Sequence, residues 1–338
     1  MKRSFGTLPC GKETFLYTIS RGGITAQITD LGAALVTLNV PDRNGNTDDV
    51  VLGYDDCHGY LRDTSFLGSV VGRNANRIKG SSFRLDGKTY RLTPNENENN
   101  LHSGPEYYHI RMWNVVEHTP ESITLELISP DGDQGFPGNA RIRVTYSLDG
   151  QGGLHLAYDG VCDKDTLFNL TNHSYFNLAG QSHTDKAMDQ VLSLPARVFT
   201  VADSESVPTG EVRSVADTPM DFRRPKAICR DIGEDYEPLL LQGGYDHNFE
   251  VFCAPCAQLS DPESGRMMAV YTDLPGIQFY AGNFLEETGK GGIRYGKRAG
   301  IALETQFWPD SANHPEWAQP FTKAGEHYRT ETVYRFTW

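Results

Sequence analysis

Ile142-Arg143-Val144-Thr145-Tyr146-Ser147-Leu148 alternates apolar and polar residues without interruption, and Asp149-Gly150 follows it directly. Successive side chains of a strand point to opposite faces, so this pattern is typical of a half-buried strand that ends in a turn. The same alternation recurs on both sides, in residues 123–127 and 154–158. This part of the chain is therefore predicted to consist of short strands separated by turns.

Similar short runs extend over the whole chain, and long helical periodicity is almost absent. Residues 83–92 carry Asp86-Gly87 at their centre, which favours a hairpin, and residues 55–63 are compatible with one short helix. Many short strands joined by turns predict an all-β fold, either a sandwich or a barrel. No linker or repeat interrupts the pattern, so we expect one domain over residues 1–338. The other strands are expected at residues 24–29, 34–40, 268–272, 277–284, 301–306 and 332–338.

The overall charge limits the kind of partner that the protein can have. The 338 residues carry a formal net charge of −13, and 38% of them are hydrophobic, enough for a sizeable core. Because there is no surplus of basic residues to neutralise phosphates, we expect neither nucleic acid nor a membrane as a partner.

Several features favour the cytoplasm as the location of the protein. Residues 1–6 contain two basic residues, but no apolar run follows them, which argues against a secretory signal. No stretch approaches the roughly 18 apolar residues that span a bilayer. The spacing of the six cysteines shows no disulfide framework, which favours a reducing compartment. Cys253 and Cys256 form a lone CxxC pair, and without a second pair we expect no zinc site.

Ala302-Leu303-Glu304-Thr305-Gln306-Phe307-Trp308-Pro309-Asp310 places a carboxylate at the end of an apolar strand. A carboxylate is seldom buried without a partner, so Glu304 either pairs with an arginine for structural reasons or has a functional role. Trp308 follows within reach. An aromatic ring beside a carboxylate suits a sugar, because the ring face stacks while the carboxylate takes a hydroxyl proton. The segment is a candidate site, with a structural ion pair as the alternative.

Five other segments combine polar functional groups with tight turns or buried neighbours. Taken singly, each has a simpler explanation. His102 and His173 can be core histidines, Arg77 can belong to an ion pair, and Asp246 can cap a turn. The five segments are residues 72–78, 100–104, 169–180, 244–249 and 275–280.

Together with the Glu304 segment, these segments resemble the aldose 1-epimerase (galactose mutarotase) family over residues 76–310, and they occur in the family's order. The resemblance implies a large antiparallel β-sandwich, also called a supersandwich. It implies an isomerase that interconverts the α and β anomers of free hexoses such as D-glucose and D-galactose. It also implies Glu304 as general base and His173 as general acid. The positions that match sugar-binding residues of the family are Asn76, Arg77, His102, Asp246 and Gln278, and to these we add Tyr175 and Trp308 as residues that shape the pocket or stack on the sugar.

One position departs from the family pattern. Ser103 follows His102 where the family commonly has glycine, so we expect its side chain to narrow the pocket or alter the loop. The resemblance also implies a monosaccharide as the partner and a monomer or homodimer as the assembly. It implies chemistry without a cofactor or a metal, because one base and one acid suffice to open and reclose a cyclic hemiacetal.

Three other functions are compatible with the same residues. A glycoside hydrolase would use two carboxylates, for which Asp246 and Glu304 are the candidates, but it would leave His173 without a role. A sugar-binding module would keep the hydroxyl-binding residues and need no acid–base pair. An epimerase for hexose 6-phosphates would need additional cationic contacts.

Overall fold

The protein is a large antiparallel β-sandwich, as the sequence predicts. The computed structural model describes all residues from Met1 to Trp338, and every ladder between its named strands is antiparallel. There are only two short α-helices, α1 (Cys57–Arg62) and α2 (Glu237–Gln242). Helix α1 confirms the helix expected within residues 55–63. Neither helix is long and apolar enough to cross a membrane.

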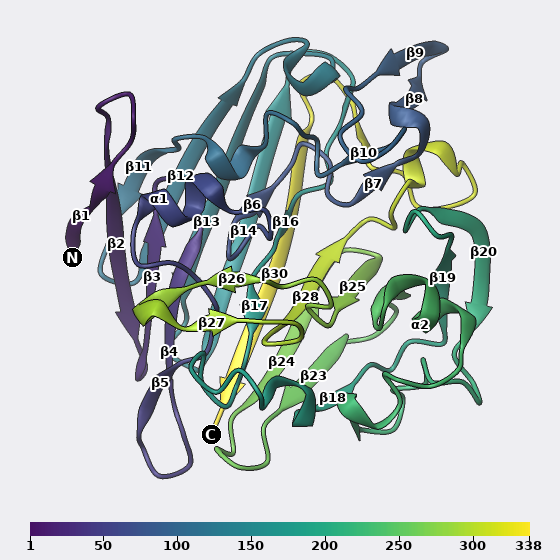
Figure 1. Cartoon of the computed structure of the whole chain (residues 1–338). Helices are drawn as coiled ribbons and strands as arrows, with labels where there is room; N and C mark the ends of the chain where they lie inside the picture. Colours follow the sequence, from purple (N-terminus) through teal and green to yellow (C-terminus); the bar gives the residue numbers. More distant parts are fainter.

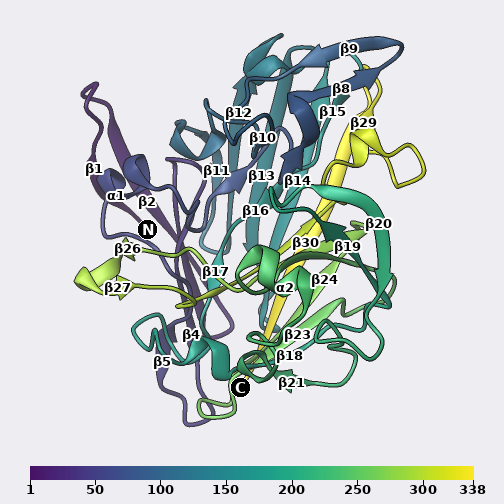
Figure 2. The same cartoon turned by 45° about the vertical axis from the view of Figure 1, so that its right-hand side comes forward.

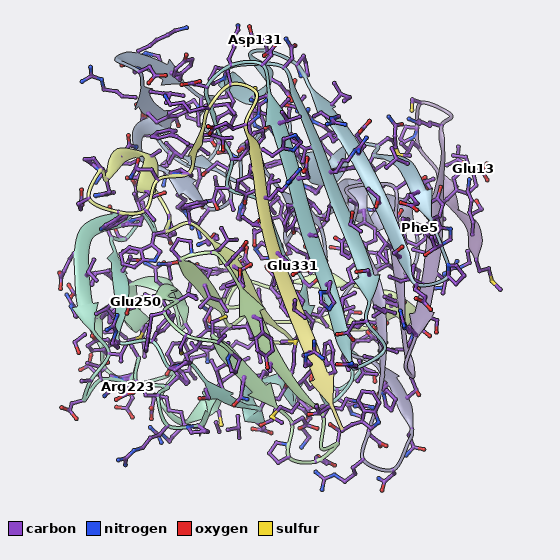
Figure 3. The ribbon with its side chains drawn as sticks, turned by 180° about the vertical axis from the view of Figure 1, so that it is seen from behind. Phe5, Glu13, Asp131, Arg223, Glu250 and Glu331 are labelled. Carbon is purple, nitrogen blue, oxygen red and sulfur yellow. The ribbon has the colours of Figure 1, made fainter.

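A nine-stranded sheet forms one layer of the sandwich. In β13 every second residue is buried, from Ala140 to Leu148, because the alternating sequence turns one face to the core and the other to solvent. Figure 3 shows this sheet from behind, with the exposed Glu331 labelled on β30. In spatial order the strands are β11 (Asn114–His118), β12 (Ser122–Ser129), β13 (Ala140–Leu148), β14 (Gly153–Cys162), β30 (His327–Thr337), β24 (Met267–Thr272), β23 (Ala257–Ser260), β18 (Val191–Ser193) and β21 (Lys226–Ala227).

A six-stranded sheet forms the facing layer and holds the Glu304 segment. Its strand β28 is buried at all six positions, since one face packs on the core and the other is covered by loops. In spatial order the strands are β17 (Tyr175–Phe176), β28 (Ile301–Gln306), β25 (Gly276–Tyr280), β22 (Asp246–Glu250), β19 (Val198–Ala202) and β20 (Pro208–Ser214).

A five-stranded sheet from the N-terminal part of the chain lies at the side of the sandwich, drawn in purple at the left of Figures 1 and 2. It consists of β1 (Lys2–Thr7), β2 (Glu13–Arg21), β3 (Ile24–Thr29), β4 (Leu35–Pro41) and β5 (Thr47–Asp49).

Five two-stranded ribbons connect these layers and carry several of the loops discussed below. The Asp86-Gly87 turn joins β8 and β9, which confirms the predicted hairpin. The ribbons are β7 (Arg77–Ile78) with β10 (Asn100–Leu101), β6 (Val70–Val71) with β16 (Thr171–Asn172), β15 (Thr166–Leu167) with β29 (Phe321–Thr322), β26 (Glu287–Thr288) with β27 (Arg294–Tyr295), and β8 (Ser82–Leu85) with β9 (Lys88–Arg91).

The largest of four hydrophobic clusters lies between the layers. It comprises 56 buried residues, and its members run from Tyr17 near one end of the chain to Phe336 near the other. Tyr146 of β13 illustrates how the layers are tied together, because its hydroxyl donates to the carbonyl of Ala33 in the N-terminal part and accepts from Asn172. The core therefore joins all three sheets.

The structure shortens one predicted strand. Residues 277–284 were expected to be extended throughout, but β25 ends at Tyr280. Gly282 has a φ of +64°, and its carbonyl accepts a hydrogen bond from Leu285 in the turn that follows. The turn leaves Phe284 exposed. The sequence pattern also missed β19, β20 and β22, which lack a clean alternation of polar and apolar residues.

Candidate active site

Three neighbouring strands of the six-stranded sheet place polar side chains side by side on one face. Glu304 on β28 lies opposite Gln278 on β25, and Asp246 on β22 lies opposite Tyr280. Residues two apart on a strand share a face, so Asp246, Gln278 and Glu304 all point away from the core. Gln278 Nε2 donates a hydrogen bond of 2.7 Å to Asp246 Oδ1. The sheet thus brings together three residues that lie far apart in the sequence.

His173 approaches Glu304 from the segment between β16 and β17. Its backbone is held on both sides, since its amide donates to Ser69 and its carbonyl accepts from Gly68. The distance from His173 Nε2 to Glu304 Oε1 is 3.6 Å. An imidazole and a carboxylate thus face each other inside the protein, at a distance that leaves room for small movements on ligand binding.

Arg77 and His102 come from the small ribbon that β7 and β10 form. Arg77 makes a two-fold contact with Glu96, with its Nε 2.5 Å from Oε2 and its terminal nitrogen 2.9 Å from Oε1. The Nδ1 atom of His102 accepts a hydrogen bond of 3.1 Å from the backbone amide of Asn76. A neutral His102 therefore carries its proton on Nε2 and can donate it to a ligand.

The backbone is strained around this site. Phe66, Asn76, His102 and Ser103 all have positive φ values, between +52° and +61°. Such conformations cost of order 1–3 kcal/mol each for residues other than glycine and cluster at functional sites. The strain marks the three segments that carry these residues as part of a specialised surface.

The side chains line a cavity of about 480 Å³. It lies within the size range of small-ligand sites in proteins. The polar groups that line it are Asn76, Arg77, Glu96, Asn97, His102, His173, Tyr175, Ser204, Glu205, Ser206, Gln242, Asp246, Tyr280 and Glu304, together with Thr64 and Ser65.

Burial acts in opposite directions on the two groups of the central pair. It raises the pKa of Glu304 well above its ordinary value, the negative charge of Asp246 adds to this, and the positive charge of Arg77 partly offsets it. Burial lowers the pKa of His173 to about 4. Burial therefore shifts a proton that the pair shares toward the carboxyl group and away from the imidazole.

Burial and neighbouring charges also shift the pKa values of His102, Asp246 and Arg77. Burial lowers the pKa of His102 well below its ordinary value, with the charges of His173 and Arg77 adding to the shift, so His102 is neutral. Burial raises the pKa of Asp246, and the charge of Arg77 and the hydrogen bond from Gln278 offset this in part. Burial lowers the pKa of Arg77, but the hydrogen bond to Glu96 and the negative charge of Asp246 have a larger effect, so the pKa is raised overall.

Comparisons with known proteins match this chain over nearly its full length. Residues 16–335 match the family model described as aldose 1-epimerase. The chain belongs to the aldose 1-epimerase family. It is 39% identical to the galactose mutarotase of Bos taurus, covering 98% of this chain and 97% of the relative, and 36% identical to the aldose 1-epimerase of Escherichia coli strain K12, covering 97% and 96%. The crystal structure of an aldose epimerase homologue from C. elegans superposes with a TM-score of 0.89 at 34% identity, covering 96% of this chain and 99% of the homologue.

Most of the residues that the resemblance to aldose 1-epimerases singles out lie at this one cavity. Asn76, Arg77, His102, His173, Tyr175, Asp246 and Glu304 all line it. Tyr175 is buried, and its ring centre lies 5.0 Å from that of His173. Gln278 is placed differently, since it stands behind Asp246 and is not part of the cavity wall.

Trp308 and Ser103 lie elsewhere than the sequence suggests. Trp308 donates its indole N–H to the carbonyl of Pro275 and packs against Trp317, away from the cavity, so it cannot stack on a ligand there. The Oγ atom of Ser103 accepts from the amide of Asn74 and donates to its carbonyl. Ser103 therefore ties two loops together and does not narrow the cavity.

Three residues that the sequence reasoning missed belong to the site. Phe66 lies 4.7 Å from His102 and 5.8 Å from His173, measured between ring centres, and packs against both. Glu96 holds Arg77, and the ring centre of Tyr280 lies 5.9 Å from that of Tyr175, edge to face, in the cavity wall. No local pattern marks Phe66 or Tyr280. Glu96 lies in a run of Asn and Glu residues, where the only signal was a carboxylate beside turn-forming residues.

The cavity offers acid–base chemistry to a neutral polar ligand. No group of three or more His, Cys, Asp or Glu side chains is arranged to hold a metal ion. The six cysteines are free thiols, and none lines the cavity. Its wall carries both hydrogen-bond donors and acceptors, which several hydroxyl groups on one small molecule require.

Proposed function

We propose that this protein interconverts the α and β anomers of free aldohexoses such as D-glucose and D-galactose, with Glu304 and His173 moving the protons. The observation that carries the proposal is the distance of 3.6 Å between Glu304 Oε1 and His173 Nε2, within a polar cavity of a size that suits a small ligand. Membership of the aldose 1-epimerase family supports the same reaction.

The reaction needs one base and one acid at the same time. The Glu304 carboxylate takes the proton of the C1 hydroxyl, the electron pair left on O1 forms the carbonyl, and the C1–O5 bond breaks. The electron pair of the broken C1–O5 bond stays on O5, which accepts a proton from His173. After rotation about the C1–C2 bond, O5 adds to the other face of the carbonyl, and each residue takes the opposite role. All atoms and protons are returned.

The single proton of the pair must sit on His173 at the start of ring opening. Burial opposes this placement, because it raises the pKa of Glu304 and lowers the pKa of His173. Transfer of that proton from Glu304 to His173 leaves the total charge of the pair unchanged. The hydroxyl groups of a bound sugar and the guanidinium of Arg77 stabilise the charged form, because both offer partners to a carboxylate in a low-dielectric site.

The remaining polar residues bind and orient the sugar. Arg77 and the Nε2–H group of His102 are donors that can stabilise negative charge on O5 as the C1–O5 bond breaks. Asp246 and Asn76 offer acceptors to ring hydroxyls. Fixing the sugar matters because both proton transfers require short contacts in the same instant.

The charge of the cavity favours free hexoses over hexose 6-phosphates. The lining includes four carboxylates, Glu96, Glu205, Asp246 and Glu304, against Arg77 as the one permanently charged cation. Arg77 is already engaged by Glu96. A phosphate group would meet repulsion without a free cationic partner.

Together with this activity we propose a cytoplasmic location, supported by six cysteines whose spacing forms no disulfide framework.

Polarimetry tests the proposal directly. Freshly dissolved α-D-glucose or α-D-galactose should reach its anomeric equilibrium faster with the protein than in buffer alone, and the final rotation should be the same, since a catalyst does not move an equilibrium. A sugar-binding module would leave the rate at the buffer value. A hydrolase would instead release nitrophenol from a nitrophenyl glycoside, and either result would overturn the proposal.

A further inference from the structure

A chain of two side-chain amides lies behind the cavity and ends at Asp246. Gln306 Nε2 donates to Gln278 Oε1 at 3.4 Å, and Gln278 Nε2 donates to Asp246 Oδ1 at 2.7 Å. Gln306 has no exposed surface, and 5% of Gln278 is exposed. Neither glutamine lines the cavity. The mechanism above uses Asp246 but assigns nothing to Gln306.

The strand register explains how the three residues meet. Gln306 lies two positions after Glu304 on β28 and therefore points to the same face. Its partner across the ladder on β25 is Gly276, whose missing side chain leaves space beside Gln306. A Cβ atom at Gly276 would lie 2.5 Å from Asn248 Oδ1 and 2.6 Å from the Trp308 ring. Asn248 and Trp308 thus occupy the space over Gly276, and Gln306 reaches diagonally to Gln278 on the same face.

The direction of these hydrogen bonds matters because an amide has two chemically different ends. Gln278 can present either its oxygen or its NH₂ group to Asp246. Only the NH₂ end is a donor, and it stabilises the Asp246 carboxylate. With Gln306 donating to the Gln278 oxygen, a flip of Gln278 would place its oxygen against the Asp246 carboxylate and its NH₂ group against that of Gln306. The Asp246 acceptor and the Gln306 donor therefore favour the same orientation of Gln278.

We propose that Gln306 is a positioning residue for the sugar site, which holds Gln278 in the orientation that keeps Asp246 a hydrogen-bond acceptor toward the ligand. The inference rests on the proposed function for its kinetic readout and extends it to a residue outside the cavity wall. Without Gln306, the Gln278 oxygen loses its donor in a buried environment, where unpaired polar groups are costly, and Asp246 alone is left to orient Gln278.

A double-mutant cycle tests the proposal. Gln306→Met and Gln278→Met keep the length of the side chain and remove the amide, singly and together. Thr305→Val is the matched control. Thr305 is the neighbouring residue on β28, is 2% exposed, and its hydroxyl pairs with that of Thr332 on the opposite face of the strand. The readouts are KM and kcat for D-galactose by polarimetry, the Kd for D-galactose by calorimetry, and Tm.

If Gln306 acts through Gln278, then Gln306→Met should raise KM and Kd about tenfold, with kcat within about threefold of the wild-type value. Gln278→Met should have a similar effect, and the double variant should be no worse than Gln278→Met alone, because residues that act as one unit are not additive. Thr305→Val should lower Tm by a similar amount and leave KM unchanged.

Two results would overturn the positioning role. One is an unchanged KM and Kd in Gln306→Met with a lowered Tm, which is what a purely structural residue would produce. The other is a double variant whose loss equals the product of the two single losses. If the wild-type protein binds D-galactose without speeding its mutarotation, the proposed function fails. The Kd values of the double-mutant cycle would still test the role of Gln306.

Discussion

The Nε2 atom of His173 lies 3.6 Å from Oε1 of Glu304, and the side chains of the two residues are only 7% and 3% exposed. Removal from water disfavours the charged form of each group. Burial therefore raises the pKa of Glu304 and lowers the pKa of His173, which favours one shared proton on the carboxyl group. A proton pair of this kind suits a reaction in which one group accepts a proton while the other gives one away.

Replacing Glu304 by Gln should abolish most of the activity without loss of the fold. The amide has the same shape but cannot take the proton of the C1 hydroxyl. Loss of a general base typically costs about 10²–10⁴-fold in rate, so kcat should fall within that range in polarimetry. His173→Asn should cause comparable harm. Thr305→Val serves as the control on the same strand, and near-normal kcat in either site variant would remove that residue from the role proposed here.

The Glu304→Gln variant should also be more stable than the wild-type protein at alkaline pH. The pKa of Glu304 is raised in the folded state, so the stability that it contributes is fully present below its ordinary value of 4.5 and is lost as pH rises through the folded-state pKa. Glutamine has no such titration. The difference in Tm between variant and wild type should therefore grow as pH rises from about 5. A difference in Tm that does not change with pH would contradict the raised pKa of Glu304.

The rate should show a bell-shaped dependence on pH, and its two limbs should report the titration of Glu304 and His173 as a coupled pair. Activity requires one shared proton. In acid the second proton binds to the imidazole, whose pKa is lowered to about 4, so the acid limb should lie near or below that pH. In base the shared proton is lost at the raised pKa of the carboxyl. A profile of kcat/KM, which reports the free enzyme, should therefore rise at acid pH and fall again above the ordinary carboxyl pKa. An acid limb near pH 6.5 would show instead that His173 titrates as an exposed histidine.

Removing the charge of Glu96 should weaken sugar binding. Glu96 fixes the guanidinium of Arg77 through two hydrogen bonds, and 12% of the Arg77 side chain is exposed. In Glu96→Gln one of the two bonds and the opposite charge are lost, so Arg77 is freed to move toward Asp246. We expect KM to rise about tenfold.

The control for Glu96→Gln is Glu211→Gln. Glu211 pairs with Arg213 at the surface, away from the cavity, and both side chains are substantially exposed. Exposed pairs contribute little, so KM should not change. An equal effect of both substitutions would mean that general charge, and not the position of Arg77, controls binding.

The activity should survive treatment with a metal chelator. Anomerisation by one base and one acid requires no Lewis acid, and the residues around the cavity suit proton transfer. After dialysis against EDTA the rate of mutarotation should stay at its starting value. Loss of activity that one added divalent ion restores would contradict the proposed mechanism.

Much of the fold could be predicted from local pattern alone. The alternation in residues 142–148 led to β13, and Asp86-Gly87 led to the hairpin of β8 and β9. These predictions succeed because the period of a strand and the geometry of a tight turn are local properties. Strand β22 was missed because its Asp246-His247-Asn248 run is polar, although most of it is buried by neighbours that come from elsewhere in the chain.

The amino-acid sequence shows which chemical groups are available: a carboxylate in an apolar strand, histidines among polar turns, and the resemblance that ordered them. Which of these groups touch depends on the tertiary structure. The fold places Trp308 outside the cavity, sets Gln278 beside Asp246, joins Glu96 to Arg77, and raises the pKa of Glu304 by burial. The physical reason is that strand register sets contacts between distant residues, and desolvation depends on what covers a group, which no local stretch of sequence contains.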